Sequence, residues 1–268
     1  MGLHVVVLLK QVLDPEIPAS RFKIDPATKR PVEGIASEVL GPYERNALEV
    51  ALQLKDAGGA DKVTALAAGS PSFQESLRKA LSVRADEAVL VDVGDAGELE
   101  PWQTATVLAR AIQKLGNVDV VIAGRQAGDW DHGQVGLLVA EQLGWPCVGF
   151  VQRARAENGH LRLERERSGV REVLTSQPPV VLTITNDDSN VLRMARVQDL
   201  MKARRQPITT WGLGDLGLAP ADLKAAAATE ILDLRIPQRE SKCEFIAGDD
   251  PHEVARQLVK RLRELKLL

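Results

Sequence analysis

The first 150 residues alternate continuous apolar runs with segments whose apolar residues recur at helical spacing. A continuous apolar run is typical of a strand covered on both faces, as in a parallel sheet. The order strand, helix, strand, helix predicts an α/β fold with a doubly wound, mostly parallel sheet and right-handed crossovers. The expected strands are residues 4–9, 63–68, 88–93 and 118–123. The expected helices are 42–54, 101–115 and 133–143, together with one that starts at about residues 70–72 and places Phe73, Leu77 and Leu81 on one face.

After Pro146 the pattern changes to short strand-like segments separated by turns. Residues 148–156 and 160–166 flank an Asn-Gly pair, which is a strong hairpin signal. Two further segments, 172–176 and 180–185, are expected to continue this meander as an antiparallel extension of the sheet. Beyond them the chain is less regular until a C-terminal helix, whose start is marked by Asp250, Pro251 and Glu253.

Composition excludes several classes of partner. Aromatic residues make up 3% of the chain, too few for the stacking platforms that bind single-stranded nucleic acid. A net charge of −3 gives no basic footprint for DNA or RNA. No apolar run approaches the roughly 18–20 residues that span a bilayer. The start, MGLHVVVLLK, lacks a basic region and a cleavage site, so we expect a cytoplasmic protein without membrane insertion.

Residues 120–150 are the most informative stretch for function. They predict a buried strand, a loop rich in Gly and Asp, and a helix. In open α/β sheets, ligands bind at the carboxyl ends of strands, where the free N–H groups of a helix N-terminus favour phosphate. Asp129 and Asp131 are available for ribose hydroxyls, and Gln126 and Gln134 for phosphate or base. A polar turn that only caps its helix accounts for the same residues, so both interpretations stay open.

Other motifs predict neither an active site nor a metal centre. Residues 212–217 (GLGDLG) match G-x-G-x-x-G formally, but they follow a short strand and run into Leu-Ala-Pro instead of a βαβ unit. Asp129, Asp131 and His132 resemble a metal cluster, yet no further ligand converges on them in the sequence. A G-x-S-x-G elbow, a Walker A motif and a local Cys–His signature are all missing from the sequence. We therefore predict no catalytic residue and no metal.

The loop and its surroundings resemble a known family. GRQAGDWDHGQVG (124–136), followed by AEQLGWP (140–146), closely resembles the signature of the electron transfer flavoprotein β subunit, GxQAxDxDxxQxG with LxxP after it. Other segments resemble the family in the same order and cover most of the chain: LLKQVLDPEIP (8–18), FKIDP (22–26), GPYERNALEVALQLK (41–55), LAAGSPS (66–72), LERE (163–166) and LMKARRQPI (200–208).

The resemblance implies a fold of the adenine-nucleotide α-hydrolase type and the role of an electron carrier, not of an enzyme. It implies a heterodimer with an electron transfer flavoprotein α subunit. The redox-active FAD would lie at the interface and be held mainly by the α subunit. The heterodimer would take electrons from flavin dehydrogenases, such as acyl-CoA dehydrogenases, and pass them to a quinone oxidoreductase or another acceptor. The β subunit itself would bind AMP or, as in bifurcating members, a second FAD.

Site residues carry over to the matching positions. The implied nucleotide-binding residues are Leu8, Gly41, Pro42, Tyr43, Glu44, Ala68, Gly69, Gly124, Gln126, Ala127, Asp129, Asp131, Gly133, Gln134 and Val135. The backbone amides of the last three would hold phosphate at the helix N-terminus. Glu166 falls near the position that faces the partner's flavin. The dehydrogenase-docking segment corresponds to about 193–200, with Arg193, Val197 and Leu200 as its docking residues.

Departures from the family pattern leave the nucleotide open. Gly41 replaces the usual Asn, which removes one side-chain hydrogen bond to the nucleotide. Val135 replaces a Thr of AMP-binding members, as in bifurcating members, whereas Trp130 and His132 differ from the Gly and Thr expected there. The alternatives are an adenine-nucleotide-binding, hydrolase-like enzyme and a nucleotide-sensing module of the same fold. The enzyme would need a phosphate-gripping loop after the first strand, and residues 10–13 (KQVL) offer none.

These inferences predict one structural unit in two parts. Residues 1–186 form a nucleotide-binding α/β domain with an antiparallel extension. Residues 187–268 form a docking loop, an irregular arm and a C-terminal helix, which bind partners.

Overall fold

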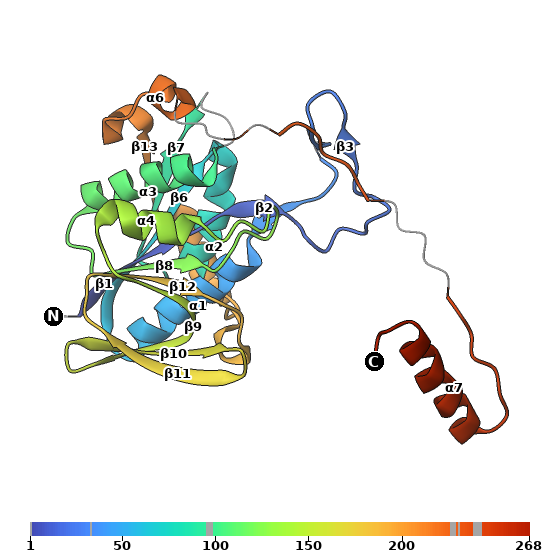
Figure 1. Ribbon diagram of the computed structural model, residues 1–268. Helices are drawn as coiled ribbons and strands as arrows, with labels where there is room; N and C mark the ends of the chain where they lie inside the picture. Colours follow the sequence, from blue (N-terminus) through green and yellow to red (C-terminus); the bar gives the residue numbers. More distant parts are fainter. Residues whose placement is uncertain (1, 33, 95–98, 226–228, 230, 238–242) are drawn as a thin grey trace.

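The centre of the molecule is a large twisted sheet. The computed structural model describes residues 2–32, 34–94, 99–225, 229, 231–237 and 243–268. Within these ranges the sheet has nine strands in the order β11-β10-β9-β12-β8-β1-β6-β7-β13 (Figure 1). The strands are β1 (Leu3–Leu8), β6 (Ala60–Gly69), β7 (Glu87–Asp92), β8 (Val120–Gly124), β9 (Cys147–Glu157), β10 (His160–Arg167), β11 (Val170–Ser176), β12 (Val180–Ile184) and β13 (Thr209–Gly212). The predicted fold class is therefore confirmed.

Helices cover both faces of the sheet, so it is doubly wound. One face packs against α1 (Pro42–Asp56), α2 (Gln74–Ser82) and α5 (Val197–Arg205). The other packs against α3 (Pro101–Leu115), α4 (Val135–Leu143), η4 (Leu213–Leu216) and α6 (Pro220–Ala225). Alternation along β1 shows the two cores, since Val5 and Val7 face the first layer while Val6 and Leu8 face the second. All four side chains are buried, which is why the run reads as continuously apolar.

One predicted pairing is wrong. The segment expected to continue the antiparallel meander, residues 180–185, instead forms β12, which lies between β8 and β9 and runs parallel to both. The reason is visible in its burial, because every residue of β12 is buried, as in a strand covered on both faces. Among the described residues, the antiparallel extension consists of β9, β10 and β11. In contrast to β12, β11 has exposed residues along its length.

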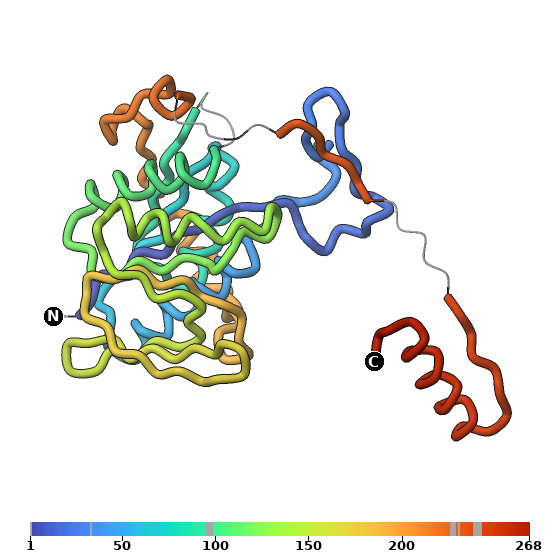
Figure 2. Tube along the Cα trace, in the orientation of Figure 1, coloured from blue at the N-terminus to red at the C-terminus, as the bar shows by residue number. Residues whose placement is uncertain are grey.

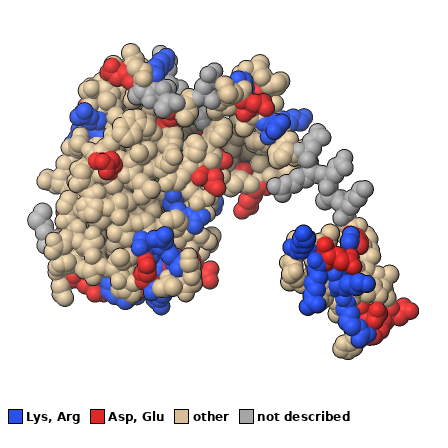
Figure 3. All heavy atoms as spheres, viewed as in Figure 1, with Lys and Arg blue, Asp and Glu red and all other residues tan. Residues whose placement is uncertain are grey.

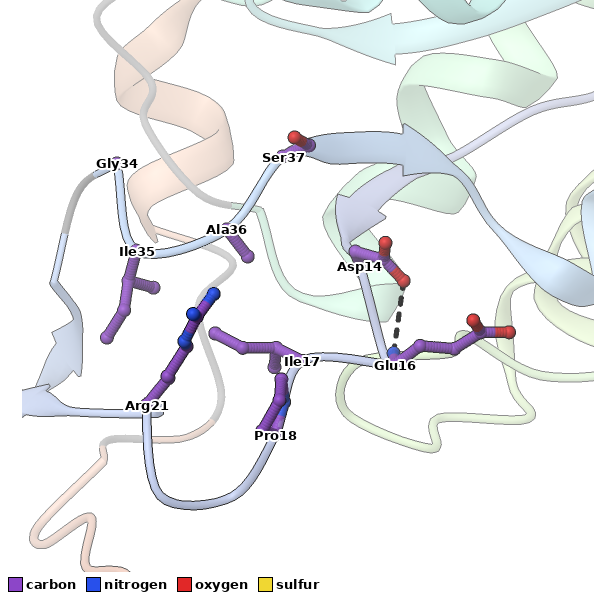
Figure 4. A pocket seen from close by; sticks show the side chains of 9 residues that line it. All are labelled: Asp14, Glu16, Ile17, Pro18, Arg21, Gly34, Ile35, Ala36 and Ser37. Carbon is purple, nitrogen blue, oxygen red and sulfur yellow. Dashed lines mark hydrogen bonds between the residues drawn. The ribbon is translucent and has the colours of Figure 1, made fainter.

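The segment between β1 and α1 projects from the carboxyl edge of the sheet. It contains two small antiparallel pairs, β2 (Gln11–Leu13) with β5 (Glu38–Leu40) and β3 (Ile24–Asp25) with β4 (Arg30–Pro31). Figure 2 shows the C-terminal arm running beside this projection, and Lys29 Nζ donates to the Ile231 carbonyl at 3.2 Å. The projection also lines an open pocket of about 450 Å³, into which the Arg21 side chain points (Figure 4).

The chain ends in the predicted helix, α7 (Pro251–Glu264), which lies apart from the sheet in Figure 1. The Asp250 carboxylate caps it by accepting from the His252 N–H at 3.1 Å, while Glu253 bonds Arg256 and Gln257 of the next turn. None of the α7 residues is buried. The division at residue 186 stays a prediction. β13, from beyond that boundary, pairs with β7 at the far edge of the main sheet.

Two short 3₁₀ turns complete the described secondary structure. The first, η1 (Pro71–Phe73), leads into α2, and the second, η3 (Asp188–Asn190), follows β12.

Candidate functional site

The carboxyl ends of β1, β6 and β8 lie at one edge of the sheet because these neighbouring strands are parallel. From β1 the chain crosses through α1 to β6 on one side, and from β7 it crosses through α3 to β8 on the other. The point between β1 and β8 is therefore the switch point of the sheet, where such folds bind ligands. Leu8, Gly69 and Gly124, all predicted site residues, end the three strands there.

The N-terminus of α1 packs directly on the end of β8. A Cβ atom at Gly124 would lie 2.9 Å from the Tyr43 Cβ and 3.1 Å from the Glu44 nitrogen, so only glycine permits this approach. The contact brings the predicted segment from Gly41 to Glu44 against the loop that follows β8. These two groups of predicted residues, about eighty positions apart in sequence, are thus neighbours in the fold.

The loop after β8 is held by its own side chains and by the end of β1. Lys10 Nζ forms an ion pair with Asp129 Oδ1 at 2.7 Å, and this oxygen also accepts from the Trp130 N–H. The Ala127 N–H donates to the His132 carbonyl at 3.0 Å, and Gln126 donates to the Asp131 carboxylate. Asp131 has a φ of 59°, which Asp tolerates better than most residues. Lys10 was not among the predicted site residues.

Arg125 is a second cation that the sequence did not single out. Its guanidinium carbon lies 4.9 Å from the Tyr43 ring centroid and 5.6 Å from that of Phe150. It donates to the Tyr43 hydroxyl at 3.0 Å, Thr185 Oγ1 at 3.2 Å and Gln126 Oε1 at 2.7 Å. Its position inside the GRQAGD motif was the available signal, but its aromatic partners come from α1 and β9. Arg125 thus fixes a positive charge at the switch point, held by stacking and hydrogen bonds.

The start of α4 offers unused donors. The helix begins at Val135, two residues later than predicted. Within the described residues, the N–H groups of Gly133, Gln134 and Val135 have no hydrogen-bond acceptor. Gly133 and Gln134 are also exposed. Three open amides at a helix N-terminus form an anion-binding position with a favourable dipole.

Glu44 is the most perturbed carboxyl group of the site. It is buried, and its Oε2 has no hydrogen-bond partner among the described residues. Its pKa is raised to about 8, chiefly by burial and also by Asp129, while a hydrogen bond with the backbone N–H of Glu44 itself and the charges of Lys10 and Arg45 lower it. Glu44 is therefore largely protonated at neutral pH.

The remaining predicted positions fall into separate places. Ala68 and Gly69 end β6, next to β1, so they share the edge with the loop. Glu166 is exposed in β10, one residue after Arg165, which pairs with Val151. Val151 in turn pairs with Ile184, the last residue of β12. Glu166 therefore lies near the carboxyl edge of the sheet, two strands beyond β12.

The predicted docking residues lie away from the loop. Arg193 is tied to α1 by ion pairs with Glu49 at 2.7 Å and Asp56 at 2.6 Å, which raise its pKa. Glu49 Oε2 also accepts from the Arg193 backbone N–H at 3.0 Å. Val197 is 76% exposed, and Leu200 is also exposed. With Met194, 94% exposed, they form an apolar surface on an anchored segment.

Neither a metal centre nor a membrane span is present in the described ranges. No group of three or more His, Cys, Asp or Glu side chains there could hold a metal ion. No helix in the same ranges is long and apolar enough to cross a membrane.

Comparison with known proteins places this architecture in a defined class. The model of the electron transfer flavoprotein domain matches residues 32–216. Over 99% of its length the chain is 35% identical to the "Caffeyl-CoA reductase-Etf complex subunit CarD" of Acetobacterium woodii, all of which is covered. It is 34% identical to an "Electron transfer flavoprotein subunit beta" of Clostridium acetobutylicum, with 98% of each chain covered. The human protein of that name is 33% identical over 81% of this chain and 84% of its own.

These similarities define a member of the electron transfer flavoproteins, a class that acts through flavin. The chain belongs to the electron transfer flavoprotein β-subunit family, and its function is electron transfer.

Proposed function

We propose that the carboxyl edge of this sheet binds AMP or a second FAD, with the phosphate on the open amides of Gly133, Gln134 and Val135. Those unpaired donors are the observation that carries the proposal. The remaining nucleotide-binding residues are the ones named from the resemblance, to which we add the cations Lys10 and Arg125. Both lie at the switch point, where Lys10 pairs with Asp129 and Arg125 bonds Gln126, and a positive charge held there favours phosphate.

We further propose that the chain carries no chemistry of its own. It pairs with an α subunit that holds the redox-active FAD at the interface, and Glu166 faces that flavin. The pair accepts electrons from flavin dehydrogenases, such as acyl-CoA dehydrogenases, and delivers them to a quinone oxidoreductase or another acceptor. A relative named as a subunit of a reductase–Etf complex supports assembly with other redox proteins. A cytoplasmic location remains a prediction.

Two surfaces are proposed to bind partners. The segment around Val197 and Leu200 docks dehydrogenases, because its apolar side chains are exposed while Arg193 holds its backbone on α1. The arm and α7 bind the α subunit. Figure 3 shows Lys and Arg side chains gathered on α7. Leu258 of the same helix is 46% exposed. A helix with one apolar and one basic face is suited to a groove on another protein.

The test is co-expression of the full chain with the α subunit encoded beside it. A heterodimer that keeps FAD through purification supports the pairing, and its absence contradicts it. Denaturing the complex then releases its nucleotides. One FAD per heterodimer with one AMP indicates structural AMP, two FAD indicate flavin in both sites, and one FAD without AMP contradicts the proposed site.

The nucleotide site is tested by substitution. Asp129→Ala removes the ion pair to Lys10 that holds the loop, so AMP retention is expected to fall about ten-fold, as for the loss of one charged hydrogen bond. Asp222→Ala, at an exposed aspartate in the first turn of α6, is the matched control. Unchanged retention in Asp129→Ala would reduce that residue to a loop-capping role.

A further inference from the structure

The side chain of Glu44 folds back over the first turn of α1. Glu44 is the third residue of the helix after Gly41, a position from which a glutamate commonly reaches the N–H of the capping residue. Here that N–H is already used, because Gly41 donates it to the Lys10 carbonyl at 3.0 Å. The carboxyl group instead interacts with the N–H of Glu44 itself, and its Oε2 is left unpaired in the described structure.

Gly41 and the Glu44 carboxyl compete for one volume. A Cβ atom built on Gly41 would overlap Glu44 Oε2, with the carboxyl carbon 2.8 Å away. Any other residue at position 41 would displace the carboxyl group. The carboxyl thus occupies the place in which a side chain of residue 41 would begin.

A buried carboxyl oxygen without a partner costs free energy, and native proteins pair nearly all such atoms. The nearby charged groups do not supply the partner. Lys10 is engaged by Asp129 at 2.7 Å, and Arg45 is exposed on the outer side of the turn. The atom lies where α1, the end of β1 and the loop after β8 meet, at the edge where we propose that the nucleotide binds.

We infer that Glu44 is a specificity-determining residue of the nucleotide site, and that its Oε2 forms a hydrogen bond with the bound adenine nucleotide. This inference rests on the proposed function. It adds that the Glu44 carboxyl group replaces the hydrogen bond to the nucleotide that is lost because residue 41 is Gly. The neutral carboxyl group donates its proton to an acceptor on the nucleotide. Burial and Asp129 oppose ionisation of the group, while the backbone N–H of Glu44 and the charges of Lys10 and Arg45 favour it; together they set the pH above which the donor is lost.

The experiment is a double-mutant cycle on the full chain, with AMP as the probe in isothermal titration calorimetry. Glu44→Ala is expected to weaken AMP binding about ten-fold, the effect of one buried hydrogen bond to a ligand. Gly41→Asn is expected to weaken it at least as much, because the new side chain displaces the carboxyl group. The double variant, Gly41→Asn with Glu44→Ala, is expected to return to within about three-fold of wild type.

Two further variants keep the result decisive. Glu44→Gln retains a neutral hydrogen-bonding group and should bind AMP within about three-fold of wild type. Glu75→Ala, at an exposed first-turn glutamate of α2, is the control and should bind as wild type does. Circular dichroism of each variant reports folding separately from binding.

The outcomes separate the inference from the proposed function. If wild type binds neither AMP nor FAD, alone or with the α subunit, the nucleotide site itself is refuted. If wild type binds AMP and Glu44→Ala binds it equally, only the role of Glu44 is refuted. A double variant whose loss equals the product of the two single losses also overturns the inference, because the two positions would then act independently.

Discussion

The sheet and the C-terminal helix have similarly regular apolar patterns, yet the chain buries only one of them. Leu90 in β7 is 0% exposed, whereas Leu258 in α7 is 46% exposed. The cover for β7 comes from α2 and α3 of the same chain, while none of the α7 residues is buried. The comparison teaches that apolar periodicity predicts an element and its apolar face, but not whether the same chain or a partner covers that face.

The largest effect expected from this difference is on stability. Leu90→Ala should lower the free energy of unfolding by about 3 kcal/mol, since it opens a cavity in a closed core. Leu258→Ala, the same substitution in α7, should change it by less than about 0.5 kcal/mol. Urea unfolding of the isolated full chain measures both. Equal losses would show that α7 packs on its own chain in solution.

A smaller effect is expected at the carboxyl edge and depends on pH. The pKa of Glu44 rises from 4.5 to about 8 on folding, so the folded chain keeps a proton that the unfolded chain releases. Stability therefore falls as pH rises through this window. Glu44→Gln stays neutral, so its free energy of unfolding should exceed that of wild type by about 2 kcal/mol at pH 6 but differ little at pH 4.5. Urea titrations of the nucleotide-free chain at both pH values test this. A constant difference between the two proteins would contradict a protonated Glu44.

The anchored docking segment lies between the two extremes of the comparison. Glu49→Ala leaves Arg193 without its main partner and should cost about 1–2 kcal/mol, less than for a fully buried pair because Arg193 is partly exposed. Amide hydrogen exchange at 191–196 should rise as the segment loosens, whereas exchange in β7 should stay the same. Glu75→Ala is the surface control. Unaltered protection at 191–196 would mean that the ion pair does not hold the segment.

The smallest effect on the sheet is expected from removing the C-terminal segment. Deleting residues 243–268 should leave the unfolding midpoint of the sheet unchanged, since no residue of α7 is buried. The same deletion should weaken heterodimer formation in size-exclusion chromatography at least about ten-fold, if α7 binds the α subunit. A deletion that lowers the unfolding midpoint of the sheet, yet leaves the heterodimer intact, would show that α7 stabilises its own chain and does not bind the α subunit.

Local sequence patterns predicted the helices and strands better than they predicted which strands and side chains contact one another. The apolar runs located β1, β6, β7 and β8, and the motif after β8 located the loop. The place of β12 was missed because an apolar run does not say which strands will flank it. Lys10 was missed for a similar reason, since its partner Asp129 is 119 positions away. The aromatic rings around Arg125 and the burial of Glu44 likewise arise only from tertiary packing.

The insertion of β12 between β8 and β9 has a consequence for the order of assembly. The hairpin strands of residues 147–176 are synthesised before the strand that joins them to the sheet. They can pair with one another as soon as they emerge, but they have no place on the sheet until β12 has paired with β8. Such late, non-local pairings slow folding and leave strand edges uncovered in the nascent chain. A ribosome-bound chain that ends before residue 180 should therefore expose those edges to chaperones.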